Sequence, residues 1–251
     1  MSSPNRDMLK ITPADLSFEP SNSTAVISEA HKFIIPVPKL GEQAEPLVYP
    51  AEHPQAGQPI VDYKGRPVGE RGLVFFNQQD QAWQAVPGDG SGVIIVNEVA
   101  PPQAVQLDEA IRQRSQDIGY LTAADLKEIL HYASTVLGLH DVYNSTRTYV
   151  QEKLVPAASE APTSVEKAYG FMKRKREDLY QAIYIPEQFI FEGPAETAQV
   201  FAHGGVIIEQ QGKLRGIQPE VFVRTYRLAS GQSIQTVAAL KTLPKAQLSS
   251  G

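Results

Sequence analysis

Histidine can act as a general acid, a general base or a metal ligand, and His203 has the most suggestive position of the histidines in this sequence. It directly precedes Gly204 and Gly205, and glycines let a backbone approach a ligand closely. A second histidine, His140, stands beside Asp141, so an imidazole and a carboxylate are adjacent in the chain. His203, His140 and Asp141 are therefore the candidate catalytic residues. The alternative interpretation is structural, with Asp141 as a helix cap.

Metal binding is the other chemistry that these side chains support. The chain has no cysteine, so a metal would be held by histidine and carboxylate ligands alone. The candidate ligands are His31, His53 and His203, with an acid such as Asp62 or Glu209. The spacings His-x-His and His-x-Asp/Glu, typical of metal sites on strands, do not occur. The sequence predicts no cofactor, and the metal site is a hypothesis.

Two further patterns have a chemical and a structural interpretation. Glu128 and His131 have the i, i+3 spacing of a di-metal helix bundle, but the second such pair that a bundle needs does not occur. We expect them on a solvated helix surface. The glycines of residues 88–92 (GDGSG) are typical of a phosphate loop, but the run VIIVN follows them. A loop that opens a strand rather than a helix is a tight β-turn.

One basic cluster stands out, formed by Lys173, Arg174, Lys175 and Arg176. Four successive cations at the end of a helix oppose its partial negative charge, which favours a solvated helix end. The alternative is a contact with nucleic acid or with an acidic partner.

Composition limits the classes of function. The chain has 251 residues, 42% hydrophobic and 20% charged, with a net charge of −5, which is typical of a globular protein and gives no overall attraction to nucleic acid. No apolar run approaches the length of a membrane-spanning helix, and the first residues lack the apolar core of a signal peptide. We therefore expect no membrane partner and a cytoplasmic location, or a virion if the chain derives from a phage.

The first half of the chain divides into an arm and a sheet that would position these residues. Residues 1–57 are rich in proline, which disfavours a continuous helix. The short apolar runs TAVISEA and KFIIPVP are of strand length, so the segment is expected to be an extended arm over another surface or an edge strand. The runs QPIVDYKGRPVG, RGLVFFNQ and GVIIVNEV predict a small antiparallel β region from residue 58 to about residue 99.

Four helices are expected next. Residues 104–118 form the first, and residues 122–138 the second, with Thr122 and Asp125 as a capping box and Gly138 at its end. A third covers residues 141–154. The β region and these three helices are expected to form one domain, residues 58–155. Residues 156–163 read as a linker, and a capping box of Thr163 and Glu166 predicts a fourth helix through Arg176.

The β pattern returns after this block, in LYQAIYIPEQFIF, GGVIIEQQ and PEVFVRTYRL. Residues 164–240 are thus expected to form a helix and a C-terminal antiparallel β module, and residues 241–251 a flexible tail. Strands followed by helices and then by strands predict an α+β fold with a four-helix central block, since a doubly wound sheet would alternate the two.

The C-terminal quarter resembles a known family. Short phage and bacterial proteins of the PGDYG type end with a Gly-Asp-x-Ile/Val run, a glycine turn and a Pro-x-x-Phe-x-x-Thr-Tyr close. The matching residues are Gly204, Gly205, Val206, Ile207, Gly212, Pro219, Phe222, Thr225 and Tyr226. The segment KREDLYQAIYI is similar to the first strand of such proteins, so the resemblance covers about residues 173–230. It implies a small β module of viral or prophage origin. Gly205 replaces the family's aspartate, and no catalytic residue carries over.

These observations leave three hypotheses. The favoured one is a non-enzymatic structural or protein-interaction protein of phage or prophage origin, which forms a homo-oligomer or larger assembly through its N-terminal arm and β modules. The first alternative is a metal-dependent enzyme with a His/carboxylate site centred on His203. The second is a nucleic-acid or nucleotide binder that uses residues 173–176.

Overall fold

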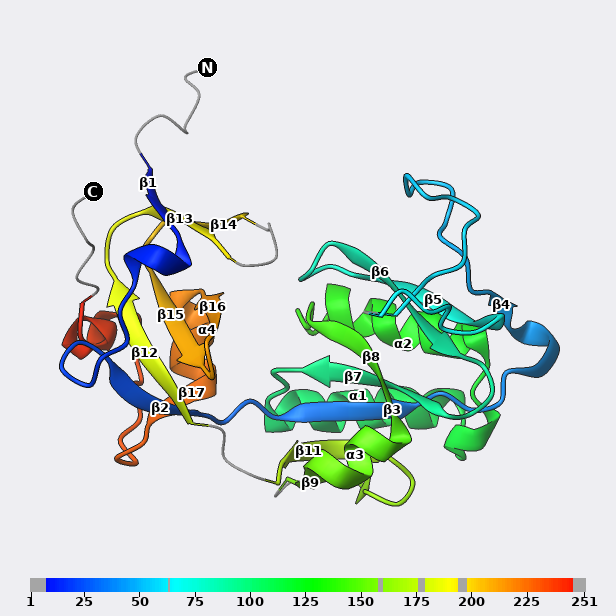
Figure 1. The fold of residues 1–251 in the computed structure, drawn as a ribbon. Coiled ribbons are helices and arrows are strands. Elements are labelled where there is room, and N and C mark those ends of the chain that lie inside the picture. The colour runs from blue at the N-terminus through cyan, green and yellow to red at the C-terminus, as the bar shows by residue number, and fades with distance from the viewer. Residues whose placement is uncertain (1–7, 63, 158–159, 176–178, 194–197, 246–251) are drawn as a thin grey trace. The chain divides into compact units, whose positions relative to one another are not determined.

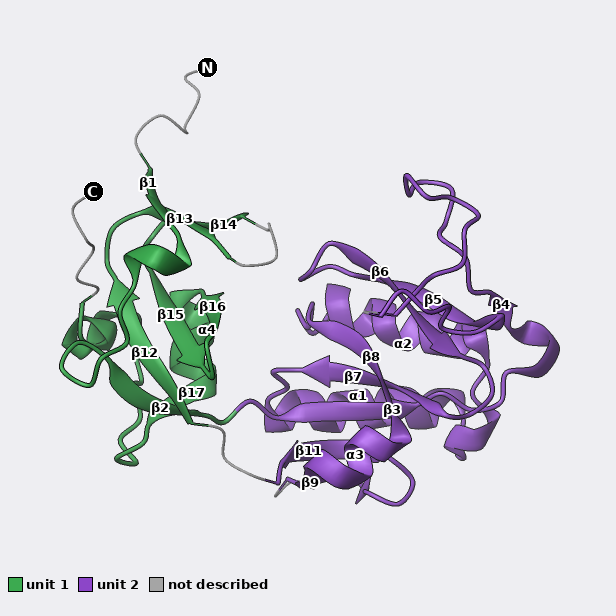
Figure 2. Ribbon diagram, viewed as in Figure 1, with its two compact units in different colours: residues 1–29, 177–251 green, residues 30–176 purple. Residues whose placement is uncertain are grey.

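The computed structural model divides the chain into two compact units (Figures 1 and 2). It describes residues 8–62, 64–157, 160–175, 179–193 and 198–245. Unit 1 consists of residues 1–29 and 177–251, and unit 2 of residues 30–176. The expected boundaries after residues 57, 155 and 163 therefore all lie within unit 2. No helix in the described ranges is long and apolar enough to span a membrane.

Unit 2 is built on an antiparallel sheet with the strand order β10-β11-β3-β7-β8, and β9 also pairs with β11. Its strands are β3 (Lys32–Pro36), β7 (Gly92–Asn97), β8 (Val142–Thr146), β9 (Leu154–Pro156), β10 (Thr163–Ser164) and β11 (Tyr169–Arg174). Both faces of this sheet are covered, so every residue of β3 and β7 is buried. That explains why these strands read as continuous apolar runs without polar alternation.

Three helices cover this sheet, α1 (Pro101–Arg114), α2 (Ala123–Thr135) and α3 (Arg147–Lys153). Phe33 and Ile35 of β3 belong to the same core as the apolar residues of α1 and α2. Ile34, between them in the chain, packs with Val150 of α3. Successive side chains of a strand point to opposite faces, so β3 joins two cores.

A second sheet completes unit 2, with the order β4-β5-β6. Its strands are β4 (Glu45–Pro46), β5 (Arg71–Asn77) and β6 (Ala82–Pro87). Asn144 of β8 links the two sheets, because its backbone amide donates to Gln84 Oε1 (2.8 Å) and its side chain to the Ala85 carbonyl (2.6 Å). The loop between β4 and β5 extends away from the rest of unit 2 (Figure 1).

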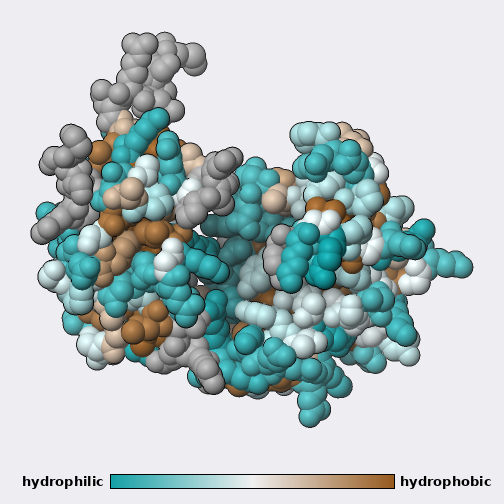
Figure 3. Space-filling view, in the orientation of Figure 1, coloured by the Kyte–Doolittle hydropathy of each residue, from teal (hydrophilic) through white to brown (hydrophobic). Residues whose placement is uncertain are grey.

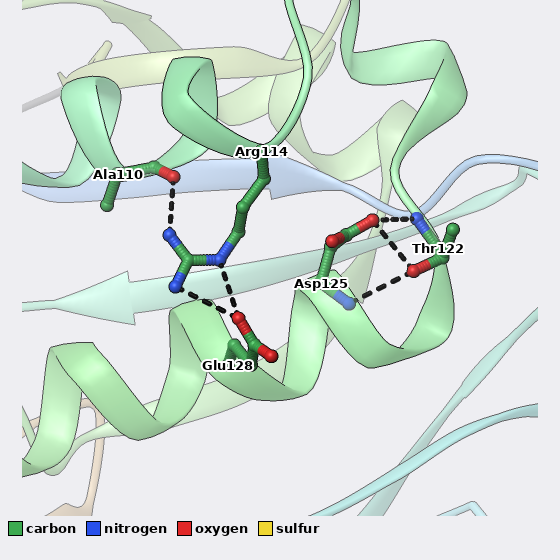
Figure 4. Close-up of polar contacts among 5 residues, drawn as sticks. All are labelled: Ala110, Arg114, Thr122, Asp125 and Glu128. Carbon is green, nitrogen blue, oxygen red and sulfur yellow. Dashed lines mark hydrogen bonds and ion pairs between the residues drawn. The ribbon is translucent and has the colours of Figure 1, made fainter.

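Helix α2 confirms its predicted start. The Thr122 amide donates to Asp125 Oδ2 (2.8 Å) and the Asp125 amide to Thr122 Oγ1 (3.1 Å), which is the expected capping box (Figure 4). At the other end, Gly138 has a φ of +68° and the Leu139 amide donates to the Ala133 carbonyl (2.8 Å). The predicted β-turn at residues 88–92 is also confirmed, since Asp89 accepts from Ser91 and β7 follows.

Unit 1 contains the two remaining sheets, with the orders β16-β15-β12-β2-β17 and β1-β13-β14. The strands of the larger are β2 (Thr24–Ser28), β12 (Leu179–Ile185), β15 (Gly205–Gln210), β16 (Lys213–Ile217) and β17 (Tyr226–Leu228). Those of the smaller are β1 (Leu9–Ile11), β13 (Phe189–Glu192) and β14 (Ala198–Phe201). Residues Ile183 and Ile207 of the larger sheet pack with Phe189 of the smaller, whereas Ala182 and Val206 face Phe222 of helix α4 (Pro219–Thr225).

The glycines beside His203 serve this packing. A Cβ on Gly204, which has a φ of +79°, would lie 2.6 Å from the Ile185 carbonyl oxygen. A Cβ on Gly205 would overlap the ring of Phe201. The close approach that these residues permit is thus to their own chain.

The predicted fold class, α+β with a four-helix central block, is wrong. The described chain is mostly β, with four sheets. The expected helix at 141–154 begins as strand β8, and only Arg147–Lys153 is helical, capped by Thr146. The expected helix from Thr163 is the hairpin of β10 and β11, because Ala168 (φ +49°) and Gly170 (φ +97°) are incompatible with a right-handed helix.

One expected strand and the expected N-terminal arm differ as well. The segment PEVFVRTYRL begins as the short helix α4, with Pro219 in its first turn, where the missing amide hydrogen costs nothing. Conversely, the expected N-terminal arm contributes β2 and β3 as inner strands of the two largest sheets.

Candidate functional site

The strongest candidate site is a cavity of about 350 Å³ in unit 2, here called the aromatic cavity. It lies between the β5–β6 hairpin, helix α2 and the segment that leads into β8. Its lining is Val74, Phe75, Phe76, Gln78, Trp83, Lys127, Leu130, His131, Ser134, Leu139, His140 and Val142. The lining is mainly apolar and aromatic, which is typical of ligand sites.

The hairpin contributes an aromatic pair, exposed Phe76 and half-buried Trp83. Phe76 of β5 is directly opposite Trp83 of β6, and the ring centroids are 5.1 Å apart in an edge-to-face arrangement. The turn between them is fixed by buried Asn77, whose side chain donates to Asp80 Oδ2 (2.8 Å) and accepts from the Gln79 amide (2.9 Å). Phe76 nevertheless remains 38% exposed. A rigid turn thus holds a large apolar surface at the rim of the cavity.

Helix α2 contributes the opposite wall. Lys127, Leu130, His131 and Ser134 follow one another at spacings of three, one and three residues, so they form one stripe along the helix. The Lys127 Nζ is 2.7 Å from Glu45 Oε1. The spacing of α2 predicted a solvated surface for His131, and the structure places this exposed side chain on the cavity wall.

Glu128 and His131 do not act together. The Glu128 carboxylate pairs with Arg114 at 3.2 Å, and Arg114 also donates to the Ala110 carbonyl (2.8 Å) (Figure 4). The two side chains therefore have separate roles. Glu128 forms an ion pair between α1 and α2, and His131 lines the cavity.

His140 and Asp141 also separate, although they are adjacent in the chain. His140 is exposed and lines the aromatic cavity. Asp141 instead accepts through Oδ2 from Asn97 Nδ2 (2.8 Å), and Asn97 Oδ1 accepts from Lys32 Nζ (2.5 Å). Asp141 is therefore part of a polar network at the start of β8 and caps no helix.

The ionisable side chains of the aromatic cavity are basic in type, and the one lysine among them pairs with Glu45. The cavity lining contains one lysine and two histidines, and none of the described lining residues is acidic. Neither imidazole has a hydrogen-bond partner within the described ranges, so both rings are available to a ligand. An aromatic surface beside such groups suits an apolar side chain or ring that carries negative charge nearby.

The candidate metal ligands occupy separate places. His31 lies against the Phe171 ring in unit 2 (centroids 5.0 Å apart), and His53 stacks on Tyr49 (4.1 Å) and accepts from the Gln55 amide (3.1 Å). His203 is exposed in unit 1, after β14. Among the residues that the structure describes, no three His, Cys, Asp or Glu side chains come together as a metal site.

The two acids proposed to accompany them have local roles. Glu209 accepts from the Gly212 amide in the β15–β16 turn (2.5 Å). Asp62 lies in the β4–β5 loop and accepts from the Arg66 amide (3.0 Å), the Arg66 guanidinium (2.7 Å) and the Lys64 amide (2.8 Å). The Arg66 amide, followed by its guanidinium, holds the pKa of Asp62 at about 2.

The low pKa of Asp62 predicts how the stability of the β4–β5 loop depends on pH. A carboxylate whose pKa is lowered on folding stabilises the loop above its ordinary pKa of about 3.9, and the contribution disappears as the pH falls through about 2. We expect an NMR titration of the Asp62 carboxyl carbon to give a midpoint near 2. Arg66→Gln should raise the midpoint part of the way, since the backbone donors remain. A midpoint near 4 in the parent protein would contradict the arrangement.

The basic cluster is located at the end of a strand, where a helix end was expected. Lys173 and Arg174 close β11 and are exposed, and successive residues of a strand point to opposite faces. Lys175 Nζ donates to the Gln151 carbonyl (2.5 Å), and Arg176 lies outside the described residues. The described cations thus do not form one continuous face.

Sequence reasoning missed the aromatic pair. Phe76 was assigned to a strand, and Trp83, the single tryptophan of the chain, was given no role. The available signal was the pairing across the turn QQDQ, which places Phe76 opposite Trp83 if the two flanking runs form a hairpin. No protein-family model, curated protein or solved structure matches this chain.

Proposed function

We propose that this protein is a non-enzymatic protein-interaction protein whose unit 2 binds an acidic segment of a partner protein. One apolar side chain of that segment occupies the aromatic cavity. The observation that carries the proposal is the pair of exposed Phe76 and half-buried Trp83 beside Lys127, His131 and His140.

The aromatic pair supports an interaction surface. On the face of unit 2 drawn in Figure 3, hydrophilic side chains predominate and hydrophobic ones form small, separate patches. A concave site with Phe76 and Trp83 at its edge differs from such a surface. Protein interfaces concentrate their binding energy in aromatic anchors and in the pockets that receive them.

The small volume and the openness of the cavity favour a side chain of a partner protein over a free small molecule. Its volume of about 350 Å³ is near the lower limit for small-molecule sites. The exposed side chains of Phe76, His131 and His140 leave it open to solvent, so a free small molecule would remain largely hydrated. A side chain on a protein segment is held in addition by contacts at the rim.

The charge of the rim favours an acidic segment. Lys127 is cationic, although it also pairs with Glu45 (2.7 Å), and the His131 and His140 imidazoles can donate hydrogen bonds to a carboxylate. The chain as a whole carries a net charge of −5, so this basic rim is a local feature that can steer an acidic partner. Assembly through further surfaces, including a second copy of this chain, is part of the same proposal. The resemblance of residues 173–230 to PGDYG-type proteins adds no catalytic residue to it.

The single tryptophan makes the proposal directly measurable. We expect the fluorescence of Trp83 to change saturably on titration with the capped peptide Glu-Glu-Phe-Glu-Glu. The peptides Lys-Lys-Phe-Lys-Lys and Glu-Glu-Ala-Glu-Glu should bind at least about tenfold more weakly, because each lacks one of the two recognition elements. Raised salt should weaken the binding of the acidic peptide.

Variants distinguish binding in the aromatic cavity from nonspecific binding to the protein surface. Phe76→Ala should weaken binding of the acidic peptide at least about tenfold, whereas Val105→Ala should leave it unchanged. Val105 is 41% exposed on α1 and does not line the cavity. Equal binding of all three peptides, or a Kd that is indifferent to Phe76→Ala, would overturn the proposal. Sedimentation velocity of the same variants shows whether a second copy is the partner, since Phe76→Ala would then dissociate the oligomer.

A further inference from the structure

A second cavity in unit 2 lies beside a buried acid that the proposed interaction does not use. This polar cavity has a volume of about 730 Å³ and lies where α1 ends and the β10–β11 hairpin turns. It is lined by Ile111, Arg112, Ser115, Gln116, Asp117, Ile118, Lys167 and Tyr169. None of these residues lines the aromatic cavity.

A buried carboxylate organises the wall of the polar cavity. Asp108 of α1 is only 6% exposed, and it accepts from the Tyr169 hydroxyl through one oxygen and from Arg112 Nε through the other (2.7 Å). Burial, followed by the hydrogen bond to Asp108, raises the pKa of Tyr169 above its ordinary value. The phenol therefore remains a proton donor to Asp108 and holds that carboxylate in place.

This arrangement orients Arg112. The guanidinium is fixed to Asp108 through Nε, and its two Nη groups have no partner within the described ranges. An arginine anchored on one edge presents the other in a fixed geometry, which is how proteins prepare a guanidinium for a phosphate or carboxylate. The side chain of Arg112 is 59% exposed, so a ligand can reach that edge.

Lys167 provides a second cation in the same cavity. It lies in the tight turn between β10 and β11, next to buried Ala168, whose φ of +49° fixes the course of the turn. Its ammonium group has no hydrogen-bond or ion-pair partner among the described residues. The last turn of α1 carries Arg112 and Arg114, which oppose the partial negative charge of the helix end.

Two further lining residues, Asp117 and Gln116, can hydrogen-bond to the neutral polar groups of a ligand. Asp117 accepts from the Gly119 amide (2.9 Å) through one oxygen, which leaves the other for a ligand hydroxyl. The Gln116 amide is exposed and can hydrogen-bond to a polar ligand.

We propose that the polar cavity binds the phosphate group of a small phosphorylated metabolite, with Arg112 and Lys167 as the phosphate ligands. Asp117 and Gln116 contact the hydroxyls of the same molecule. Asp108 and Tyr169 are positioning residues, because they act on the ligand through Arg112. The site is independent of the aromatic cavity, so either proposal can fail alone.

Calorimetric titration with three probes tests the site. We expect glucose 6-phosphate to bind the full-length protein, inorganic phosphate to bind more weakly, and glucose not to bind. Equal binding of inorganic phosphate would support the anion site and assign free phosphate as its occupant. Failure of both phosphates to bind would overturn the proposal.

Matched variants locate the binding. Arg112→Gln and Lys167→Gln should each weaken binding of glucose 6-phosphate about tenfold or more, since each removes a charged hydrogen bond. Arg114→Gln removes a cation from the same helix end outside the lining and should have little effect. Tyr169→Phe should weaken binding severalfold, because Asp108 loses the hydroxyl that holds it against Arg112, and unchanged binding in this variant would show that Tyr169 does not position Arg112. Equal losses in Arg114→Gln and Arg112→Gln would show a diffuse charge effect and overturn the assigned ligands.

Discussion

Gly170→Ala is expected to destabilise unit 2 by at least about 3 kcal/mol. Two effects combine at this position. Gly170 has a φ of +97°, a conformation that L side chains rarely adopt, and an added Cβ would overlap the carbonyl oxygen of Pro162. That oxygen belongs to the backbone leading into β10, so it cannot yield as a flexible side chain would. Relief would require separating β10 from β11.

The measurement uses Trp83, because the single tryptophan of the chain lies in unit 2. Urea unfolding followed by its fluorescence should show a markedly lower midpoint for Gly170→Ala. Gly57→Ala is the matched control, since Gly57 also has a positive φ (+78°) but a Cβ there would meet nothing within 4 Å. It should cost only about 1–2 kcal/mol, from the backbone strain alone. Equal costs for the two variants would show that the overlap with Pro162 is relieved without loss of packing.

The same hairpin shows why sequence reasoning failed for the central block. Thr163 and Glu166 have the spacing of a capping box, and that spacing correctly predicted α2 from Thr122 and Asp125. In the hairpin, however, the Lys167 amide donates to Ser164 Oγ (3.2 Å) and closes a turn. Short polar side chains satisfy the backbone equally well in turns and at helix starts, so the local pattern does not decide between them.

The inner positions of β2 and β3 in their sheets were missed for a different reason. Strand β3 contains Pro36, and prolines within a run favour an edge or an arm. The backbone of β3 pairs with Met172 of β11 and with Asn97 of β7, and neither partner is near in the sequence. Pairing over such distances leaves no periodic signal in the strand itself, and complete burial removes the polar alternation that would have identified it.

Part of the candidate site could be predicted from the sequence. His140 was singled out from its neighbour Asp141, and the structure assigns it instead to a cavity with His131 and the Phe76–Trp83 pair. The helical stripe that carries His131 could be read from spacing. The hairpin that faces it could be expected only as two strands, because the packing of a hairpin on a helix depends on tertiary contacts.

Phe222→Ala is expected to destabilise unit 1 by about 3–5 kcal/mol. Phe222 is completely buried, and its ring stacks on that of Tyr226 with centroids 4.9 Å apart and planes 7° from parallel. It packs between α4 and the face of the larger sheet that carries Ala182 and Val206. Truncation would remove this contact area and leave a void that α4, held in place by Pro219 and β17 at its two ends, cannot fill by a small shift.

Hydrogen exchange distinguishes a local loss of packing from a general one. Amides of β12 and β15, which pair at the centre of the affected sheet, should exchange faster in Phe222→Ala as the free energy of opening falls. Val200→Ala is the control, because Val200 is 52% exposed in the same unit and should change stability by less than about 0.5 kcal/mol. Unchanged exchange in β12 and β15 of Phe222→Ala would mean that α4 is dispensable to this sheet. In that case Tyr226, which also contacts Tyr180 edge-to-face (5.9 Å), would have to anchor the C-terminal segment by itself.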